Sequence, residues 1–185
     1  MEDKIHKISP IKAIVIVLLI TGIVAMLWYQ FARKTPERLA KEYSSATGWL
    51  LVCDTEEHTL SLFKQSIKAK PGEWKPILYN CFPCSTGQLV LKDGKMQTCT
   101  PKGFSYIHWK ERRHSFPEFT SWYNCWIKGG FAIHSTLYAP NEPEPITELD
   151  DRLGVDASTS CIRVKIDIAK WMYNNLPVGT PIVVY

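Results

Sequence analysis

The longest uninterrupted apolar stretch lies near the N-terminus, at residues 13–29. Its 17 positions hold no charged side chain, and they lack the polar face of an amphipathic helix. Seventeen residues are near the lower limit for a helix that crosses a bilayer. Trp28 and Tyr29 stand at one end, where amphipathic rings favour the lipid–water boundary. The pattern predicts a transmembrane anchor over residues 13–31, preceded by a short tail at 1–12.

A cleavable signal peptide is the alternative interpretation of this stretch, and it requires small residues at a cleavage site. Residues 27–34 read Leu-Trp-Tyr-Gln-Phe-Ala-Arg-Lys, which offers no such pattern, so we expect an uncleaved anchor. Basic residues flank both ends in nearly equal number, so the positive-inside rule gives no orientation.

After this stretch the hydrophobic pattern becomes that of a mostly β domain. Residues 32–47 are polar and predict a juxtamembrane linker or short helix. From residue 48 onward, short apolar runs alternate with turns rich in Pro, Gly and Asp, which is typical of strands. We expect strands at 49–53, 59–63, 74–79, 103–109, 130–134 and 181–185, and a helix at 167–175 that ends before Pro177. Residues 48–185 are therefore predicted to form a sandwich or partly open barrel with one packed helix.

The net charge of +4 arises mainly outside this predicted domain. Residues 1–34 hold five basic and two acidic side chains, which leaves 17 basic against 16 acidic side chains in 35–185. A protein that binds nucleic acid needs a concentrated basic face to displace counterions. The sequence has no such stripe, so we expect no nucleic-acid partner.

Six cysteines, at positions 53, 81, 84, 99, 125 and 161, are many for a domain of this size. In an exported domain, the five other than Cys161 predict at least one disulfide, and Cys81 and Cys84 are the closest pair in sequence. Cys81-Phe-Pro-Cys84 also resembles a redox motif or half of a zinc site. It lacks two further ligands at suitable spacing and a following helix, so we expect no metal and no cofactor.

Cys161 and His134 are the candidate nucleophile and base. A thiol attacks carbonyls as a thiolate, and a neighbouring imidazole takes its proton and later returns it to the leaving amine. His134 ends an apolar run, and Cys161 follows a turn of small residues that leaves the sulfur accessible and directs N–H groups at an oxyanion. Arg163 would share a face with Cys161 in an extended chain and could bind a carboxylate. The alternative is that His134 has only a structural role and that Cys161 is an ordinary buried cysteine.

These motifs resemble those of the L,D-transpeptidase catalytic domain family (YkuD-type). The family signature is a histidine, a spacer and then [Ser/Thr]-x-Gly-Cys-[Ile/Val]-Arg. Here it reads Ile133-His134-Ser135-Thr136 and Ser158-Thr159-Ser160-Cys161-Ile162-Arg163. Upstream, Cys84-Ser-Thr-Gly87 and Thr100-Pro-Lys-Gly-Phe104 resemble the family's Ser-Thr-Gly strand and Thr-Pro-x-Gly-x-Phe loop. The resemblance covers about the whole of residues 48–185.

The resemblance implies a β-sandwich with a mixed sheet and one or two short helices. It implies that Cys161 is acylated, that His134 is the general base and that the Ser135 carbonyl orients the imidazole. Arg163, Ser160 and Thr159 would contact the substrate, a peptidoglycan peptide stem. Acylation would release D-alanine from a tetrapeptide donor, and an amine of a neighbouring stem would then form a 3→3 cross-link. The catalytic domain would lie outside the cell, tethered by a single membrane helix.

Two positions depart from the family pattern. The family usually has glycine immediately before the cysteine, where this chain has Ser160, and often histidine before that, where it has Thr159. If position 160 needs a positive φ, serine costs about 1 kcal/mol or more in strain. Cys161 also lies 27 positions after His134, with a Pro- and Glu-rich insert at 140–145, which a loop tolerates at low cost. The alternatives are an L,D-carboxypeptidase and a degenerate domain that binds wall peptides without turnover.

Overall fold

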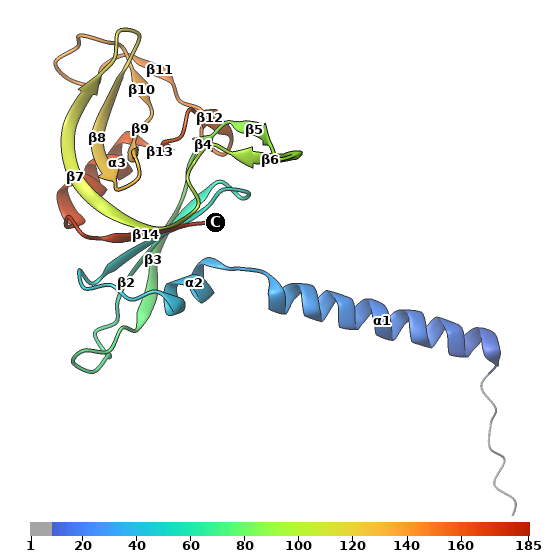
Figure 1. The fold of residues 1–185 in the computed structure, drawn as a ribbon. Helices are drawn as coiled ribbons and strands as arrows, with labels where there is room; N and C mark the ends of the chain where they lie inside the picture. The colour runs from blue at the N-terminus through green and yellow to red at the C-terminus, as the bar shows by residue number, and fades with distance from the viewer. Residues whose placement is uncertain (1–8) are drawn as a thin grey trace, which may run out of the picture. The chain divides into compact units, whose positions relative to one another are not determined.

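The structure, a computed structural model, describes residues 9–185. Most of the tail expected at 1–12 therefore lies outside the described residues. The chain divides after Thr35 into two compact units, and each is described by itself (Figure 1).

The first unit contains one helix, α1 (Pro10–Ala32), which runs through the apolar stretch. Ser9 caps the helix by accepting a hydrogen bond from the Lys12 N–H, and Pro10 occupies the first turn, where no N–H partner is needed. Among residues 9–185, no helix satisfies the length and hydropathy that a membrane span requires. The transmembrane anchor expected over 13–31 is thus not supported by the structure, although a helix is present there.

The second unit, residues 36–185, is mostly β. Its strands are β1 (Trp49–Asp54), β2 (Thr59–Gln65), β3 (Pro76–Pro83), β4 (Thr86–Gly87), β5 (Leu89–Lys92), β6 (Lys95–Thr98), β7 (Gly103–Ser115), β8 (Thr120–Ile127), β9 (Phe131–Ser135), β10 (Leu137–Tyr138), β11 (Glu148–Asp150), β12 (Asp156–Ser158), β13 (Ile162–Val164) and β14 (Pro181–Val184). Its helices are α2 (Pro36–Glu42) and α3 (Ile166–Asn175).

Ten of these strands form one mixed sheet. The order is β11-β10-β8-β7-β14-β1-β2-β3, and β9 pairs with both β8 and β13. The β1–β14 and β9–β13 pairs are parallel, whereas the other pairs of this sheet are antiparallel. The long strand β7 pairs with β14 near its start and with β8 over the rest, and it curves visibly between the two halves (Figure 1). The predicted mixed sheet is confirmed.

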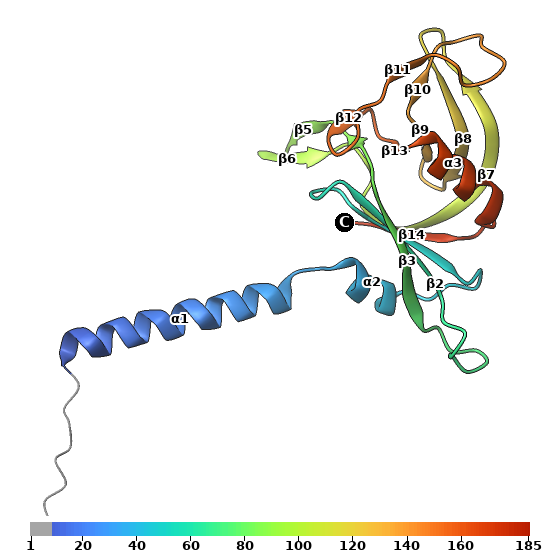
Figure 2. The same cartoon turned by 180° about the vertical axis from the view of Figure 1, so that it is seen from behind.

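The packing of the core explains why some strands are apolar at nearly every position. Strand β1 is buried on both faces. Leu51 and Cys53 join a large core with α3, whereas Leu50 and Val52 pack in a second core with α2. Helix α3 covers one face of β8 and β9 (Figure 2) and buries Ala169 and Met172 there.

Helix α2 lies in the segment expected as a linker at 32–47, and it packs onto the β domain. Leu39 and Ala40 are buried against the second core, and the Trp74 Nε1–H donates to the Ala40 carbonyl at 2.9 Å. The compact unit therefore begins at Pro36, ahead of the predicted strand run.

The expected disulfide is absent, since all six cysteines are free thiols. Cys81 is exposed, whereas Cys84, three positions later, is buried. In an extended chain, side chains three positions apart point to opposite faces, which keeps this pair apart. Cys53, Cys84 and Cys125 act as small apolar residues of the core.

Candidate active site

The parallel pairing of β9 and β13 brings the predicted nucleophile and base onto one face of the sheet. Ile162 pairs with Ile133, and Arg163 pairs with His134. Because neighbouring positions alternate between faces, Cys161, Arg163 and His134 project from one face, while Ile133 and Ile162 enter the core on the other. The Cys161 thiol interacts with the Ala132 backbone, two residues before His134.

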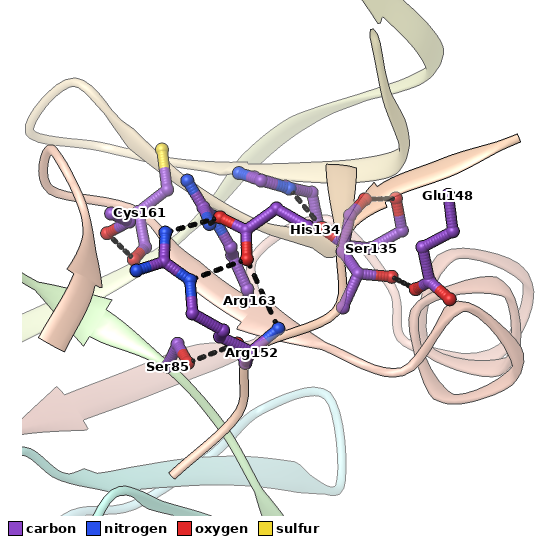
Figure 3. A network of polar contacts seen from close by, with 10 residues as sticks. Ser85, His134, Ser135, Glu148, Arg152, Cys161 and Arg163 are labelled. Carbon is purple, nitrogen blue, oxygen red and sulfur yellow. Dashed lines mark hydrogen bonds and ion pairs between the residues drawn. The ribbon is translucent and has the colours of Figure 1, made fainter. Parts of the chain in front are cut away.

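His134 is oriented by the residue that follows it. Its side chain is 6% exposed, and its Nδ1 lies 2.6 Å from the Ser135 carbonyl oxygen. A carbonyl only accepts, so Nδ1 carries the proton and Nε2 is left as the acceptor. In Figure 3 the ring's other nitrogen points toward the side on which Cys161 lies. The predicted role of the Ser135 carbonyl has the geometry it requires.

The electrostatic environment keeps His134 neutral. The pKa of His134 is lowered to about 4, chiefly by burial and in smaller part by the charges of Arg163 and His114, while the Ser135 hydrogen bond opposes them. At neutral pH the imidazole is therefore ready to accept a proton.

Cys161 rests as a thiol. Burial raises its pKa above the ordinary value, while the Ala132 backbone, the Arg163 charge and the Ser160 hydroxyl each lower it in part. The turn before it is closed by Ser158, whose hydroxyl donates to the Cys161 carbonyl at 2.5 Å. The resting site thus holds a neutral thiol and a neutral imidazole on one sheet face, without a hydrogen bond between them among the described residues.

The backbone at Ser160 is not strained, so glycine at this position would relieve no strain. The non-glycine residues with positive φ are His58, Asp93, Tyr123 and Asn141, within residues 9–185. Position 160 therefore has a backbone conformation open to any residue, so the condition for strain, a positive φ, is not met. Thr159 is exposed at the tip of the turn, and Ser160 is half-buried beside the thiol.

Replacing Ser160 with glycine is expected to slow acylation about tenfold, rather than speed it. The change removes a hydroxyl that lowers the thiol pKa, and it adds backbone freedom worth about 1 kcal/mol to a turn that must stay ordered. The measurement is the second-order rate of carbapenem labelling. Ser160→Ala, which removes the hydroxyl alone, is the matched control. Faster labelling of the glycine variant would show that the turn does need glycine.

Arg163 is held by Asp150, a residue that sequence reasoning did not single out. The Arg163 NH1 donates to the Asp150 carboxylate at 2.7 Å, and Arg152 donates two side-chain hydrogen bonds to the same carboxylate at 2.8 Å (Figure 3). Hydrogen bonds from Arg152, and then from Arg163, hold the pKa of Asp150 well below its usual range. The Arg163 Nε, in contrast, is buried and has no hydrogen-bond partner among the described residues.

The segment Ser85–Gly87, which carries the Ser-Thr-Gly motif, supports this arrangement from the other side. The backbones of Ser85 and Arg163 exchange hydrogen bonds of 2.9 and 2.8 Å, and the Ser85 hydroxyl donates to the Arg152 carbonyl. Gly87 lies so close to the Cys99–Thr100 backbone that a Cβ would stand 2.6 Å from the Thr100 nitrogen. The glycine of the motif is required by this close approach.

The insert between His134 and Cys161 is attached to the sheet. Thr136 hydrogen bonds to Glu148, which is labelled in Figure 3. The Ala139 N–H donates to the Thr147 carbonyl at 2.8 Å. These contacts place Asp150 beside Arg163. Five acidic residues occur between positions 142 and 151, so no sequence signal distinguished this one.

Comparison with known proteins agrees with the fold. The chain belongs to the L,D-transpeptidase catalytic domain family (YkuD), whose model matches residues 49–184. A protein of Bacillus subtilis (strain 168) named for L,D-transpeptidase activity, YciB, is 33% identical over 107 residues. That match covers 52% of this chain and 53% of YciB, so the chain spans about half the length of this relative.

Solved structures share the fold. A Clostridium acetobutylicum protein, described as a fused Zn-dependent amidase/peptidase/peptidoglycan-binding domain-containing protein, aligns with a TM-score of 0.55 and 28% identity. The alignment covers 80% of this chain and 57% of that one. The L,D-transpeptidase LdtMt1, solved in complex with imipenem, aligns with a TM-score of 0.50 and 21% identity, over 75% of this chain and 59% of that one. The L,D-transpeptidase-like fold expected from the motifs is confirmed.

Proposed function

We propose that this domain is a peptidoglycan L,D-transpeptidase that forms a thioester on Cys161. The observation that carries the proposal is the shared face of Cys161, His134 and Arg163, with His134 neutral and oriented by Ser135. A thiol nucleophile needs its base within hydrogen-bond reach, and in this proposal that contact forms when the substrate binds. Family membership gives the reaction class.

In the first half-reaction, the His134 Nε2 accepts the proton of the Cys161 thiol. The thiolate, stabilised by the Arg163 charge, attacks the carbonyl of the third residue of a tetrapeptide stem. The C–N bond to D-alanine breaks, and Nε2 returns the proton to the leaving amine. In the second half-reaction, an amine of a neighbouring stem attacks the thioester, and its proton passes through Nε2 to the departing sulfur.

In this proposal Arg163 also binds the donor stem. Its NH1 is committed to Asp150, whereas its buried Nε lacks a partner among the described residues. A buried donor without an acceptor costs free energy, so a donor-stem oxygen that accepts from Nε would be bound with a gain. Thr159 and Ser160 flank the sulfur, and we assign them to contacts with the stem on either side of the scissile bond.

An L,D-carboxypeptidase, in which water resolves the thioester, is the enzymatic alternative, and a domain that binds stems without turnover is the non-enzymatic one. The burial of His134 and the partial burial of Cys161 favour an amine over bulk water as acceptor. The test is incubation of the purified protein with tetrapeptide stems and mass analysis of the products. A 3→3 dimer with free D-alanine is expected. Tripeptide alone would indicate the carboxypeptidase, and unchanged stems would overturn both enzymatic assignments.

The site of action follows from the substrate. Peptide stems of the wall lie outside the cytoplasmic membrane, so we place the domain there. Residues 13–29 contain no charge, and the apolar side chains of α1 from Ile14 to Tyr29 are exposed, which favours attachment to lipid. Retention of the protein in membranes washed at alkaline pH is expected, and complete release into the supernatant would contradict attachment.

A further inference from the structure

A compact cluster of aromatic and acidic side chains lies on the β7–β8 hairpin. We call Trp109, Glu111, His114 and Trp126 the tryptophan–glutamate cluster. The two indoles stack with ring centroids 5.4 Å apart and an interplanar angle of 6°. The Glu111 Oε2 accepts hydrogen bonds from the Trp126 Nε1 at 3.2 Å and from the His114 Nδ1 at 2.9 Å. These bonds fix the carboxylate at the edge of the Trp126 indole.

The cluster lies on the same face of the sheet as the candidate active site. Trp109 pairs with Trp126, and Trp126 pairs with Ala132 on β9. The Ala132 backbone in turn interacts with the Cys161 thiol. Directly paired residues share a face, so one row runs across the sheet from Trp109 to Cys161. The sulfur lies about two strand spacings, or roughly 10 Å, from Trp126.

The cluster presents an accessible surface with negative charge. Trp109 is 45% exposed, although it lies on a sheet face that is otherwise well covered. The second carboxylate oxygen of Glu111 accepts no hydrogen bond from any described residue. Of the neighbouring cations, Lys110 donates to the Tyr173 carbonyl beside α3, Arg112 pairs with Glu144, and the Arg113 guanidinium lies over the Trp122 ring. Aromatic faces beside a carboxylate are the surroundings that bind an ammonium group.

We propose that the tryptophan–glutamate cluster binds the side-chain ammonium of the donor stem's third residue. This assignment rests on the proposed function. A 3→3 cross-link joins the third residues of two stems, so that residue bears an amine. The same residue is acylated on Cys161, and a side chain with a four-carbon stem spans most of the distance to Trp126.

The amine of the donor stem suits the tryptophan–glutamate cluster better than the attacking amine of the acceptor stem. An amine held by a carboxylate and indole faces stays protonated, because both stabilise the charged form. A protonated amine is not a nucleophile, so the cluster is unsuited to the attacking group. It would instead keep the donor's own amine from attacking its thioester, and it would hold the acylated residue in one orientation.

The experiment measures binding of tetrapeptide stems to the Cys161→Ala protein, which allows no turnover. Stems with a free third-residue amine and stems with that amine acetylated are compared at pH 8, where an imidazole is largely neutral. Glu111→Gln and Trp109→Leu are each expected to weaken binding of the free-amine stem about tenfold and to leave the acetylated stem unchanged. Glu118→Gln and Phe104→Leu, exposed positions on and beside the same hairpin, are the controls.

Equal losses for both stems, or no loss for either, would overturn the assignment. A second measurement separates this outcome from failure of the proposed function. Acylation of the parent chain, with Cys161 present, by a penem without a basic side chain reports on Cys161 alone, and neither cluster variant should change its rate. If the parent protein is not acylated, the proposed function fails, whereas the binding comparison still decides whether the cluster selects an ammonium.

Discussion

Replacing Cys161 with alanine is expected to abolish covalent labelling by a carbapenem and to abolish 3→3 cross-linking. Of the other thiols, Cys53, Cys84 and Cys125 are buried in the core, Cys81 is on β3 and Cys99 follows β6, so none lies on β9 or β13. Cys161 is half-buried in a turn of small residues, so its loss adds little to the free energy of unfolding, about 1 kcal/mol or less. The measurement is intact-protein mass after incubation with the carbapenem.

Cys81→Ala is the matched control for this variant, because Cys81 is an exposed thiol away from the site. It should be labelled at the parent rate. Circular dichroism and urea unfolding establish that both variants are folded. Persistent labelling of a folded Cys161→Ala protein would move the nucleophile to another residue.

Replacing His134 with alanine is expected to slow acylation by about 10² to 10⁴, the usual contribution of a positioned base, while the thiol remains. The Cys161 pKa is raised by burial, so few thiolates form without an acceptor for the proton. Single-turnover labelling rates measure the effect. His108→Ala, an exposed histidine on β7, serves as the control and should label normally. A His134→Ala rate within threefold of the parent would exclude this base.

The pH profile gives an independent check on His134. Its pKa is about 4 in the folded protein and near 6.5 in the unfolded chain, so the folded state binds fewer protons between these values. The acylation rate should therefore hold from neutral pH down to about pH 5 and fall near pH 4. The free energy of unfolding should decline as the pH drops from 6.5 toward 4, and His134→Ala should lessen that decline. A loss of acylation rate centred near pH 6.5 would mean that burial does not lower the pKa of His134.

Much of the fold follows from short-range patterns. The apolar run at 49–53 becomes β1 and the run at 130–134 becomes β9, because each is buried on both faces and needs no polar alternation. The predicted helix at 167–175 matches α3 within a residue at its start. In contrast, β7 extends to Ser115, well past the expected end at 109, because its polar second half pairs with β8. Pairing with β8, the other strand of the same hairpin, determined that length, and the polar pattern of residues 110–115 alone does not show it.

The candidate site, like the fold, could be predicted from the sequence only in part. The motifs point to Cys161, His134 and Arg163 because the signature is made of residue types in a short, fixed order. The sequence alone could not identify Asp150 as the partner of Arg163. Asp150 lies in an insert whose position depends on tertiary contacts, such as the hydrogen bond of Thr136 to Glu148. The sequence pattern did not separate the accessible aromatic residues of positions 109–126 from the buried ones. The structure buries Trp122 and Tyr123 and leaves Trp109 accessible in the row that leads to Cys161.

The most direct test of the central claim is peptide mapping of the acyl-enzyme formed with a natural donor. The purified protein is mixed with a tetrapeptide stem, quenched in acid and digested, and the adduct is located by mass spectrometry. The account predicts that the peptide containing Cys161 gains the tripeptide acyl group, with release of one D-alanine, and that an added amine-bearing stem removes it. An adduct on any other residue, or D-alanine release without an adduct in a rapid quench, would contradict it.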